Sequence, residues 1–495
     1  MVPALALFII ILLEGYVVLS TELLVIRQLL PFVGSGTDTI SIIIAAVLMP
    51  LAFGYFIGGQ YRPVFNNRGV YMTIRRKLAA NILISSAFLL AGLSFATYTI
   101  FFETLISSGV TNRLILTSAY VLAFTVIPVF LLGQTVPLAS NYFRRHKMAE
   151  STGKVLFFST VGSFLGAVFS TLVLMSFFGV NIAVMTNFFF LFYIMFVLER
   201  ANLRRNRLLA NRNFINMGIF LILAIAMNSQ PVLTTSNIVA FNEYNMVRII
   251  SDEDGSKHFT LNNNLSSKVG ADGMPHGYIA YVDQQFIAPT QHEAIKPKDI
   301  LVIGAGGFTL GLSDEKNYYT FVDIDDDLKD LAEEHFLPKK LGKNKQFEPT
   351  PARAFLTQTK KKYDLILLDA YVGDVSIPEH LVTKEFFAQV KTRLRNDGVI
   401  IANFILSPGF DSAFARNIDA TLRSIYPFVS RLAVTRYDGW NKSPEMLNNI
   451  LYIYWHDEDY KRPSIYTDNK NTMFVDKPHN KMLIYELPSD ELATP

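Results

Sequence analysis

A glycine-rich turn followed by an acidic residue is the first pattern in this sequence that could bind a ligand. The segment Asp299–Leu312 begins with an apolar run of strand length, which ends in a turn that contains Gly304, Gly306 and Gly307. A second apolar run ends in Asp323, 19 residues after Gly304. Turn glycines let the backbone approach a ligand closely, and an acidic residue at that offset suits the two hydroxyls of a ribose. The pattern predicts a nucleoside-binding site.

A second pattern supplies candidate catalytic groups. The strand-length run Leu365–Leu368 ends in Asp369, and Asp374 follows five residues later. Three more polar side chains lie in the same segment: Tyr371, Glu379 and His380. Ligands bind beyond the carboxyl ends of strands in open α/β sheets, where carboxylates can hold a cation and take a proton from an amine. The alternative is a solvated loop that caps a helix expected over Thr383–Arg395.

Other chemistries have weaker support. Gly304-Ala305-Gly306-Gly307 alone would suit a flavin or nicotinamide enzyme almost as well. The lone histidines His276 and His292, with Glu293, lack a metal-binding spacing such as HExxH, so we expect surface or packing roles and no metal site. The sequence has no cysteine, which excludes disulfides, thiolate nucleophiles and cysteine-based metal sites.

The composition divides the chain into a membrane part and a soluble part. Of its 495 residues, 51% are hydrophobic and 18% are charged, and the mean hydropathy is +0.28. The apolar excess lies in the first part of the chain. We therefore predict a transmembrane helical domain, a linker with a small β-rich lead-in, a Rossmann-like α/β domain and a tail, over 1–230, 231–295, 296–457 and 458–495 respectively.

About seven apolar runs could cross a hydrocarbon core of about 30 Å. They are Val2–Ile26, Ile40–Gly59, Leu78–Phe102, Leu114–Gly133, Val155–Phe178, Ile182–Leu198 and Phe214–Met227. The first run lacks a basic leader and a small-residue cleavage site, so we interpret it as a retained anchor.

Basic residues follow the second, fourth and sixth runs. They are Arg62, Arg68, Arg75, Arg76 and Lys77; then Arg144, Arg145, Lys147 and Lys154; then Arg200, Arg204, Arg205, Arg207 and Arg212. By the positive-inside rule these loops and the N-terminus are cytoplasmic. Seven spans then put the C-terminal domain outside the cytoplasm, in a multi-pass protein of the cell (inner) membrane. With a net charge of +3, these clusters indicate orientation in a lipid bilayer rather than nucleic-acid binding.

Polar residues within the apolar runs are candidates for function, because ionisable groups at depth are costly. Glu14 lies in the middle of the first run, where a ligand or proton role stays open. Glu22 and Arg27 lie nearer its end, and a plain ion pair is the simpler interpretation. Gly162 and Gly166 suit close packing of helices.

The lead-in contains one clear pattern and one ambiguous stretch. Glu243–Ile250 and Lys257–Asn262 flank a turn and predict a β-hairpin. The stretch His276–Gln291 fits either a short strand or a helix.

The order of these motifs resembles the spermidine synthase (polyamine aminopropyltransferase) family, through LVIGAGG, FVDID, YDLILLDAY and GVIIANF. A closer resemblance is to bacterial membrane proteins in which several spans precede a spermidine synthase-like domain. It includes GSGTDTISIIIAAVLMPLAFGYFIGG, STGKVLFFSTVGSFLGAVFSTLVL and LDAYVGDVSIPEHLVTKEFF. The resemblance implies an α-helical transmembrane bundle joined to a Rossmann-like domain of the S-adenosylmethionine methyltransferase type with a small β-domain before it.

The resemblance also implies residue roles. Gly304, Gly306 and Gly307 would border the nucleoside donor, Asp323 would bind its ribose, Asp369 would be the base, Asp374 would help hold the cationic acceptor, and Tyr371, Glu379 and His380 would line its pocket. The implied reaction moves an aminopropyl group from decarboxylated S-adenosylmethionine to a small amine and releases methylthioadenosine. This co-substrate is not tightly bound, and no metal is required. The family also implies a homodimer. The aromatic residues Tyr452, Tyr454 and Trp455 would suit a dimer interface, but core packing explains them as well.

The sequence departs from the family pattern at two places. The family has an aspartate, which would meet the adenine amino group, where this chain has Thr350-Pro351-Ala352-Arg353. The family's Asp-rich loop is longer than DAYVGD, so the acceptor need not be putrescine. Two alternatives stay open beside aminopropyl transfer: a transferase of the S-adenosylmethionine type with another donor or acceptor, and a non-catalytic membrane protein that binds a ligand or partner.

Overall fold

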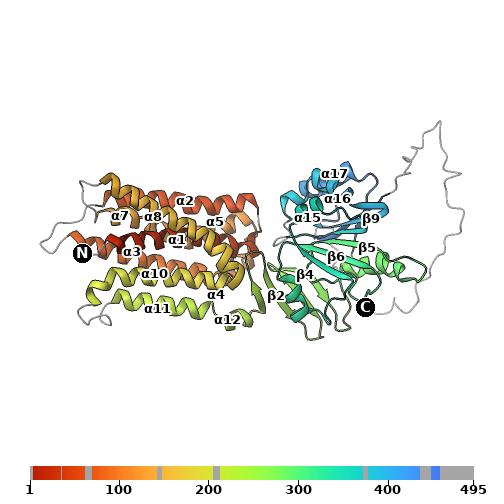
Figure 1. The fold of residues 1–495 in the computed structure, drawn as a ribbon, viewed down its shortest axis with the longest axis horizontal. Coiled ribbons are helices and arrows are strands. Elements are labelled where there is room, and N and C mark those ends of the chain that lie inside the picture. The colour runs from red at the N-terminus through yellow and green to blue at the C-terminus, as the bar shows by residue number, and fades with distance from the viewer. Residues whose placement is uncertain are drawn as a thin grey trace. The chain divides into compact units, whose positions relative to one another are not determined.

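The computed structural model describes residues 4–34, 36–61, 70–141, 148–203, 212–371, 377–434 and 447–456. Met1–His456 forms one compact unit. Its N-terminal part is helical (Figure 1), with α1 (Ala4–Val33), α2 (Thr37–Gln60), α3 (Val70–Leu93), α4 (Phe95–Ser107), α5 (Arg113–Phe124), α6 (Val126–Gly133), α7 (Thr135–Ser140), α8 (Met148–Phe169), the π-helical turn η2 (Ser170–Met175), α9 (Ser176–Phe178), α10 (Val180–Leu203), α11 (Arg212–Met227) and α12 (Gln230–Thr235).

These helices cover all seven predicted runs but differ in length. In the described part of the chain, five are long and apolar enough to cross a membrane, and six if α5 and the helices after it, bent by 43°, count as one span. The seventh, α11, has 16 residues, or about 24 Å at 1.5 Å per residue, less than a full hydrocarbon core. Seven full spans are therefore not established.

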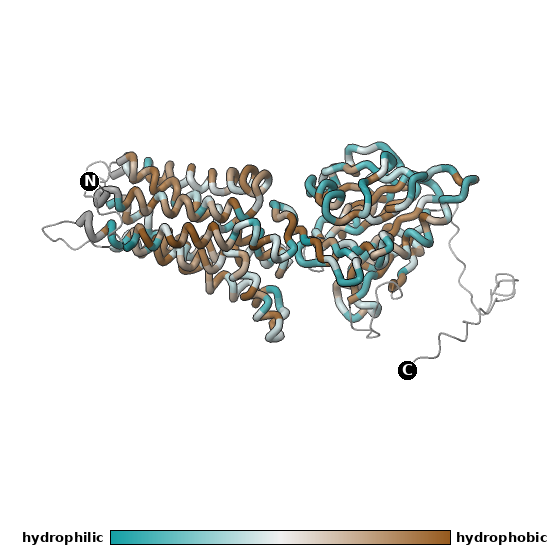
Figure 2. The backbone as a smooth tube through the Cα atoms, turned by 90° about the horizontal axis from the view of Figure 1, so that it is seen from below, coloured by the Kyte–Doolittle hydropathy of each residue, from teal (hydrophilic) through white to brown (hydrophobic). Residues whose placement is uncertain are grey.

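The helices are apolar on their outer faces as well as inside. Figure 2 shows hydrophobic residues along most of their length. Several large apolar side chains point outward, including Leu48, Phe56, Leu172 and Phe177. A helix that is hydrophobic all round is buried in a large core or in lipid. The described part of the bundle therefore exposes an apolar surface on its outside.

The polar residues of α1 differ in their surroundings. Glu14 is buried, and neither of its carboxylate oxygens has a hydrogen-bond partner among the described residues. Side chains at Gly162 and Gly166 of α8 would overlap the backbone of α1, so both glycines serve close helix packing, as predicted. The described residues contain no Glu22–Arg27 ion pair. That interpretation was wrong, because Arg27 Nε donates instead to the Asn242 carbonyl oxygen, at 2.7 Å.

The lead-in is a four-stranded antiparallel sheet of β1 (Ile238–Phe241), β2 (Met246–Ser251), β3 (Lys257–Leu261) and β4 (Asn264–Val269), in that order. Strands β2 and β3 confirm the predicted hairpin. The ambiguous stretch that follows is helical, with α13 (Tyr278–Val282), the π-helical turn η4 (Asp283–Ile287) and the 3₁₀ turn η5 (Ala288–Gln291).

The C-terminal part contains a seven-stranded sheet in the order β10-β11-β9-β8-β5-β6-β7. The strands are β5 (Asp299–Ile303), β6 (Tyr318–Asp323), β7 (Lys345–Pro349), β8 (Tyr363–Leu368), β9 (Leu394–Leu406), β10 (Ser430–Ala433) and β11 (Asn448–Trp455). From β7 to β9 the neighbours are parallel, whereas β11 runs antiparallel to β9 and to β10. The chain order reverses between β5 and β8, and such a switch point is where ligands bind in open α/β sheets. The Rossmann-like prediction is confirmed.

Alternate residues of each strand pack on opposite faces of this sheet. In β5, Leu301 and Ile303 join one core with the helices α15 (Ala352–Gln358), α16 (Lys384–Lys391) and α17 (Ala413–Ile425), which Figure 1 draws together. Ile300 and Val302 join the opposite core, with α13, α14 (Leu328–Leu331), the π-helical turn η6 (Ala332–Phe336) and the lead-in. Strands buried on both faces explain the continuous apolar runs in the sequence.

Two predicted features near the C-terminus need adjustment. The helix expected over Thr383–Arg395 ends at Lys391, because Arg395 belongs to β9, where it pairs with Asp299 and Asp364. Tyr452 and Tyr454 are buried in the sheet core, as packing predicted, whereas Trp455 is exposed. Several predictions lie outside the described residues: Asp374, the basic residues at 62, 68, 144, 145, 147, 204, 205 and 207, and the tail over 458–495.

Candidate active site

Asp369 lies at the carboxyl end of β8, next to the switch point of the sheet. Its carboxylate accepts hydrogen bonds from the hydroxyl of Tyr278 and, at 2.9 Å, from Nδ2 of Asn403. Burial raises the pKa of Asp369 to about 7, although these two hydrogen bonds act to lower it. A carboxyl group with a pKa near neutrality is matched to proton transfer at physiological pH. The position and the raised pKa of Asp369 agree with what a general base requires.

Tyr278 and Asn403 are site residues that the sequence analysis missed. Tyr278 belongs to the stretch whose secondary structure was ambiguous, and it begins α13. Asn403 lies in β9 within GVIIANF, where a single amide interrupts an apolar strand. That interruption was the available signal, because a polar side chain inside a buried strand needs a partner.

The glycine turn after β5 allows the backbone to lie close to Asp369. Gly304 has φ +92°, and a side chain there would overlap the carbonyl group of Asp369. Gly306 has φ +49° and faces Ser266 of the lead-in strand β4. The N–H of Gly307 donates to Oγ of Ser267, at 3.0 Å. The lead-in therefore contacts the turn at Gly306 and Gly307, whereas Asp369 contacts it at Gly304.

Asp323 lies at the end of β6, as predicted, and faces the same space. Its carboxylate accepts from the backbone N–H groups of Ala305 and Ile324, at 2.9 and 2.8 Å, and from that of Asp325, at 3.3 Å. Burial raises its pKa, and these N–H groups act to lower it. A carboxylate has about four lone pairs. Three backbone bonds orient Asp323 and leave acceptor capacity for a ligand hydroxyl.

A cavity of about 1440 Å³ joins the predicted residues. It is lined by Gly304, Gly306, Asp323, Asp369, Tyr371, Glu379 and His380 among others. Gly307 is not among the lining residues, because it packs on Phe336 and Ser267. The structure therefore brings the two predicted patterns to one site.

The polar residues after Asp369 are held in different ways. The Tyr371 hydroxyl donates to the Asn403 carbonyl oxygen at 3.2 Å and accepts from the Ile405 N–H at 2.7 Å, so it braces β9. Burial and then the Asp369 charge raise the pKa of Tyr371 well above its usual range. Glu379 and His380 are exposed at the edge of the cavity. Arg353 donates to the carbonyl oxygen of His380 through Nε and Nη2, at 2.9 and 2.7 Å.

Residues 282–440 match the family model described as the spermine/spermidine synthase domain. The chain carries a spermidine synthase-like domain. The matched segment contains the glycine turn, Asp323 and Asp369, and Tyr278 precedes it by four residues.

The relatives of this synthase-like domain include two curated bacterial proteins. A polyamine aminopropyltransferase of Vibrio vulnificus is 34% identical over 163 residues, which are 31% of this chain and 52% of that protein. A probable polyamine aminopropyl transferase of Bifidobacterium longum is 30% identical over 152 residues, 30% of this chain and 32% of that protein. The chain thus spans about half or less of the length of these relatives. A solved probable spermidine synthase from Corynebacterium glutamicum is 19% identical, with a TM-score of 0.36 over 45% of this chain and 81% of that one.

Pro351 and Ala352 occupy the edge of the synthase-like site beyond β7 and line the cavity. The N–H of Thr350 donates to the carbonyl oxygen of Asp323 at 2.7 Å, so this segment is tied to the Asp323 loop. Neither Pro351 nor Ala352 has a side-chain acceptor. The departure noted in the sequence is therefore present at the site itself.

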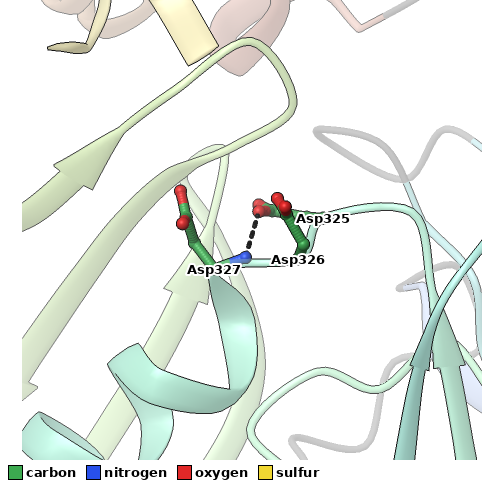
Figure 3. A group of neighbouring side chains, drawn as sticks. All are labelled: Asp325, Asp326 and Asp327. Carbon is green, nitrogen blue, oxygen red and sulfur yellow. Dashed lines mark hydrogen bonds between the residues drawn. The ribbon is translucent and has the colours of Figure 1, made fainter. Parts of the chain in front are cut away.

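Three consecutive carboxylates follow Asp323, and Figure 3 shows the N–H of Asp327 bonded to the Asp325 carboxylate, at 3.2 Å. The ligand atoms of Asp325, Asp326 and Asp327 lie within 4.8 Å of one another. The buried Asp325, however, accepts from the side-chain amides of Asn242 and Asn245, at 2.9 and 2.7 Å. These bonds give Asp325 a structural role, and we assign the group no metal.

The same amides connect the synthase-like site to the helical part. Arg27 of α1 donates to the Asn242 carbonyl oxygen and, through Nη2, to Oδ1 of Asn262 at 3.3 Å. Its guanidinium also lies 4.8 Å from the centre of the Phe241 ring. A continuous set of hydrogen bonds thus runs from Arg27 through Asn242 and Asp325 to Asp323. Sequence spacing gave no signal for it, since Arg27 and Asp325 are 298 residues apart.

Proposed function

We propose that the protein is a membrane-bound transferase that moves an aminopropyl group from decarboxylated S-adenosylmethionine to an amine acceptor. The observation that carries this proposal is Asp369, half-buried at the switch point, bonded by Tyr278 and Asn403 and facing the same cavity as Asp323. The match to the spermine/spermidine synthase domain and the two curated relatives support it.

In the proposed reaction the acceptor amine first loses a proton to the Asp369 carboxylate. Its lone pair then attacks the methylene carbon bonded to the sulfonium, a new C–N bond forms, and the C–S bond breaks with its electron pair going to sulfur. The products are methylthioadenosine and the aminopropylated amine.

The chain contributes orientation, a base and carboxylates that stabilise cationic groups. Gly304, Gly306 and Asp323 hold the donor, and Tyr371, Glu379 and His380 border the acceptor. Asp374 remains a predicted acceptor ligand.

One assay distinguishes aminopropyl transfer from two alternatives: a non-catalytic binding protein, and a transferase with a different donor. The full chain, purified in detergent, is incubated with decarboxylated S-adenosylmethionine and a panel of primary amines, and methylthioadenosine is measured. Release that requires an amine is expected. Tight binding of methylthioadenosine without turnover would favour the non-catalytic alternative, and methyl transfer from S-adenosylmethionine would favour a different donor.

We also propose that the helical part inserts in the cell membrane, with its basic ends and N-terminus in the cytoplasm. Five helices of sufficient length and the outward apolar side chains support insertion. With seven spans, the synthase-like domain lies outside the cytoplasm. Fusions of reporters to Pro495, one active only in the cytoplasm and one only outside it, test this placement. Activity of the cytoplasmic reporter alone would show that the chain crosses the membrane an even number of times.

The site is expected to discriminate poorly between nucleobases, because the side chains of Pro351 and Ala352 offer no acceptor to the adenine amino group. Methylthioadenosine and methylthioinosine should bind within about fivefold of each other, since one neutral hydrogen bond contributes about 1 kcal/mol. Pro351→Asp should raise the preference for adenine about tenfold, the effect of a charged hydrogen bond of about 1.5 kcal/mol. Calorimetric titration of both ligands measures this ratio. An unchanged ratio in a folded Pro351→Asp protein would show that the adenine edge lies elsewhere.

Arg27 is expected to support donor binding from the helical part. Arg27→Met should weaken methylthioadenosine binding about tenfold, a loss of about 1.4 kcal/mol, because Asn242, which bonds to Asp325, then loses its contact with α1. Arg248→Met is the matched control, since Arg248 lies 6.0 Å from the Phe95 ring of α4 and outside this set of bonds. Calorimetry on both variants decides the point. Equal affinities would restrict Arg27 to a role in folding.

A further inference from the structure

The helical part supplies one wall of the candidate active site. The cavity that contains Asp369 is also lined by residues at the ends of three bundle helices: Leu30 and Val33 of α1, Gly36 and Thr37 at the start of α2, and Arg113 at the start of α5. All three helices belong to the candidate membrane spans, α5 as part of the bent pair. If the bundle spans the bilayer, these helix ends lie at the level of the lipid headgroups. The acceptor side of the site therefore faces the membrane surface.

A carboxylate and a guanidinium contact two adjacent residues of this wall, Thr37 and Gly36. Oγ1 of Thr37 donates to Oε1 of Glu379 at 2.9 Å, which joins α2 to the acceptor side of the cavity. The neighbouring Gly36 has no side chain, and a Cβ there would lie 3.3 Å from Nη1 of Arg113. Nη2 of Arg113 pairs with Oδ2 of Asp38 at 2.8 Å, and the Arg113 side chain is 52% exposed. A ligand at this wall thus meets the negative Glu379 beside Thr37 and the positive Arg113 beside Gly36.

Apolar side chains complete the same wall. Leu30 is half-buried and Val33 buried in α1. Leu265 and Phe414, which also line the cavity, are large hydrophobic residues with 56% and 45% of their surface exposed. Exposed apolar side chains around a binding site suit a ligand with an apolar portion. A short diamine such as putrescine offers no phosphate for Arg113 and little apolar surface for these residues.

We propose that the acceptor is the headgroup of an ethanolamine phospholipid, an inference that rests on the proposed transferase function. The headgroup ammonium would lie between Glu379 and Asp369, the phosphodiester would lie at Arg113, and the acyl chains would follow the apolar helices. The headgroup nitrogen loses one proton to Asp369 and attacks the methylene carbon bonded to the sulfonium. The C–N bond forms as the C–S bond breaks, its electron pair goes to sulfur, and methylthioadenosine leaves. The lipid product carries an N-(3-aminopropyl) headgroup.

The test uses the full chain reconstituted in phosphatidylcholine vesicles with or without phosphatidylethanolamine, and a donor labelled in its aminopropyl group. We expect label in the extracted lipid only when phosphatidylethanolamine is present. Label in soluble putrescine but not in the lipid would overturn the inference and keep the transferase. Equal labelling of soluble glycerophosphoethanolamine would overturn the lipid as the source of the amine. Methylthioadenosine binding without labelling of any amine would overturn the transferase as well.

Variants of the ion pair at the wall separate a headgroup contact from a structural role. Arg113→Gln should raise the phosphatidylethanolamine concentration for half-maximal rate about tenfold, as the loss of a charged hydrogen bond to phosphate predicts. Arg113→Lys should recover part of this loss. Asp38→Asn breaks the same ion pair but keeps the guanidinium, and should leave that concentration within about threefold of wild type. Equal effects of Arg113→Gln and Asp38→Asn would assign the ion pair to helix packing and contradict the proposed phosphate contact.

Discussion

Replacement of Asp369 by asparagine is expected to lower kcat for aminopropyl transfer about 1000-fold, within the range of contributions that general bases make. Asparagine has nearly the same shape and can keep a bond to the Tyr278 hydroxyl, but it cannot accept a proton from an amine. Methylthioadenosine affinity should change less than about threefold, because Asp323 and the glycine turn hold the nucleoside. The measurement is single-turnover transfer together with calorimetric binding.

Asp364→Asn is the matched control for this variant. Asp364 lies on the same strand, near its other end, where it pairs with Arg395 and Lys298. Its replacement can lower stability but should leave kcat per folded molecule unchanged. Asp369→Asn with wild-type kcat would remove Asp369 as the base.

The raised pKa of Asp369 predicts how the rate of transfer depends on pH. Burial raises the pKa of Asp369 to about 7, and only the deprotonated carboxylate can act as the base. The value of kcat/KM should therefore rise with pH and level off above about 7, since it reports groups of the free enzyme. This rise of kcat/KM with pH should be absent from the residual activity of Asp369→Asn. Its persistence there would assign the titration to another group, such as the acceptor amine.

Replacement of Asp323 by alanine is expected to weaken methylthioadenosine binding about 100-fold. Two ribose hydroxyls would lose a charged acceptor, and each such bond contributes about 1.5 kcal/mol or more. The variant also leaves the N–H groups of Ala305, Ile324 and Asp325 without their carboxylate. Turnover at saturating donor should fall much less, because Asp323 contacts no reacting atom.

Asp326→Ala serves as the control for Asp323→Ala, since Asp326 is exposed in the same loop. Calorimetry should show wild-type affinity for this control. A nucleoside without ribose hydroxyls at positions 2′ and 3′ should bind to wild type as weakly as methylthioadenosine binds to Asp323→Ala. If Asp323→Ala instead keeps full affinity, the ribose lies elsewhere in the cavity.

The sequence was sufficient to predict the strands that position the site. Leu301–Ile303 and Leu365–Leu368 are apolar runs of strand length, so their carboxyl ends, and with them Gly304 and Asp369, were expected at one edge. Asp323 followed from its offset to Gly304. These predictions succeeded because they depend on local periodicity and on one rule of sheet topology.

Contacts between distant segments could not be predicted in this way. Tyr278 reaches Asp369 from a helix whose type the sequence left open, and Arg27 reaches Asn242 from the first apolar run. Such contacts depend on how elements pack, which no single-sequence period encodes. The expected Glu22–Arg27 pair failed for the same reason, since a carbonyl oxygen of the lead-in lies within reach of the guanidinium.

The most direct test of the proposed reaction is a double-label experiment with one purified preparation of the full chain. Decarboxylated S-adenosylmethionine labelled in its aminopropyl group and S-adenosylmethionine labelled in its methyl group are supplied together with amine acceptors in vesicles and in solution. The proposed function predicts that only the aminopropyl label enters an acceptor, with one methylthioadenosine released per label transferred. Transfer of the methyl label, or methylthioadenosine binding with neither label transferred, would contradict it.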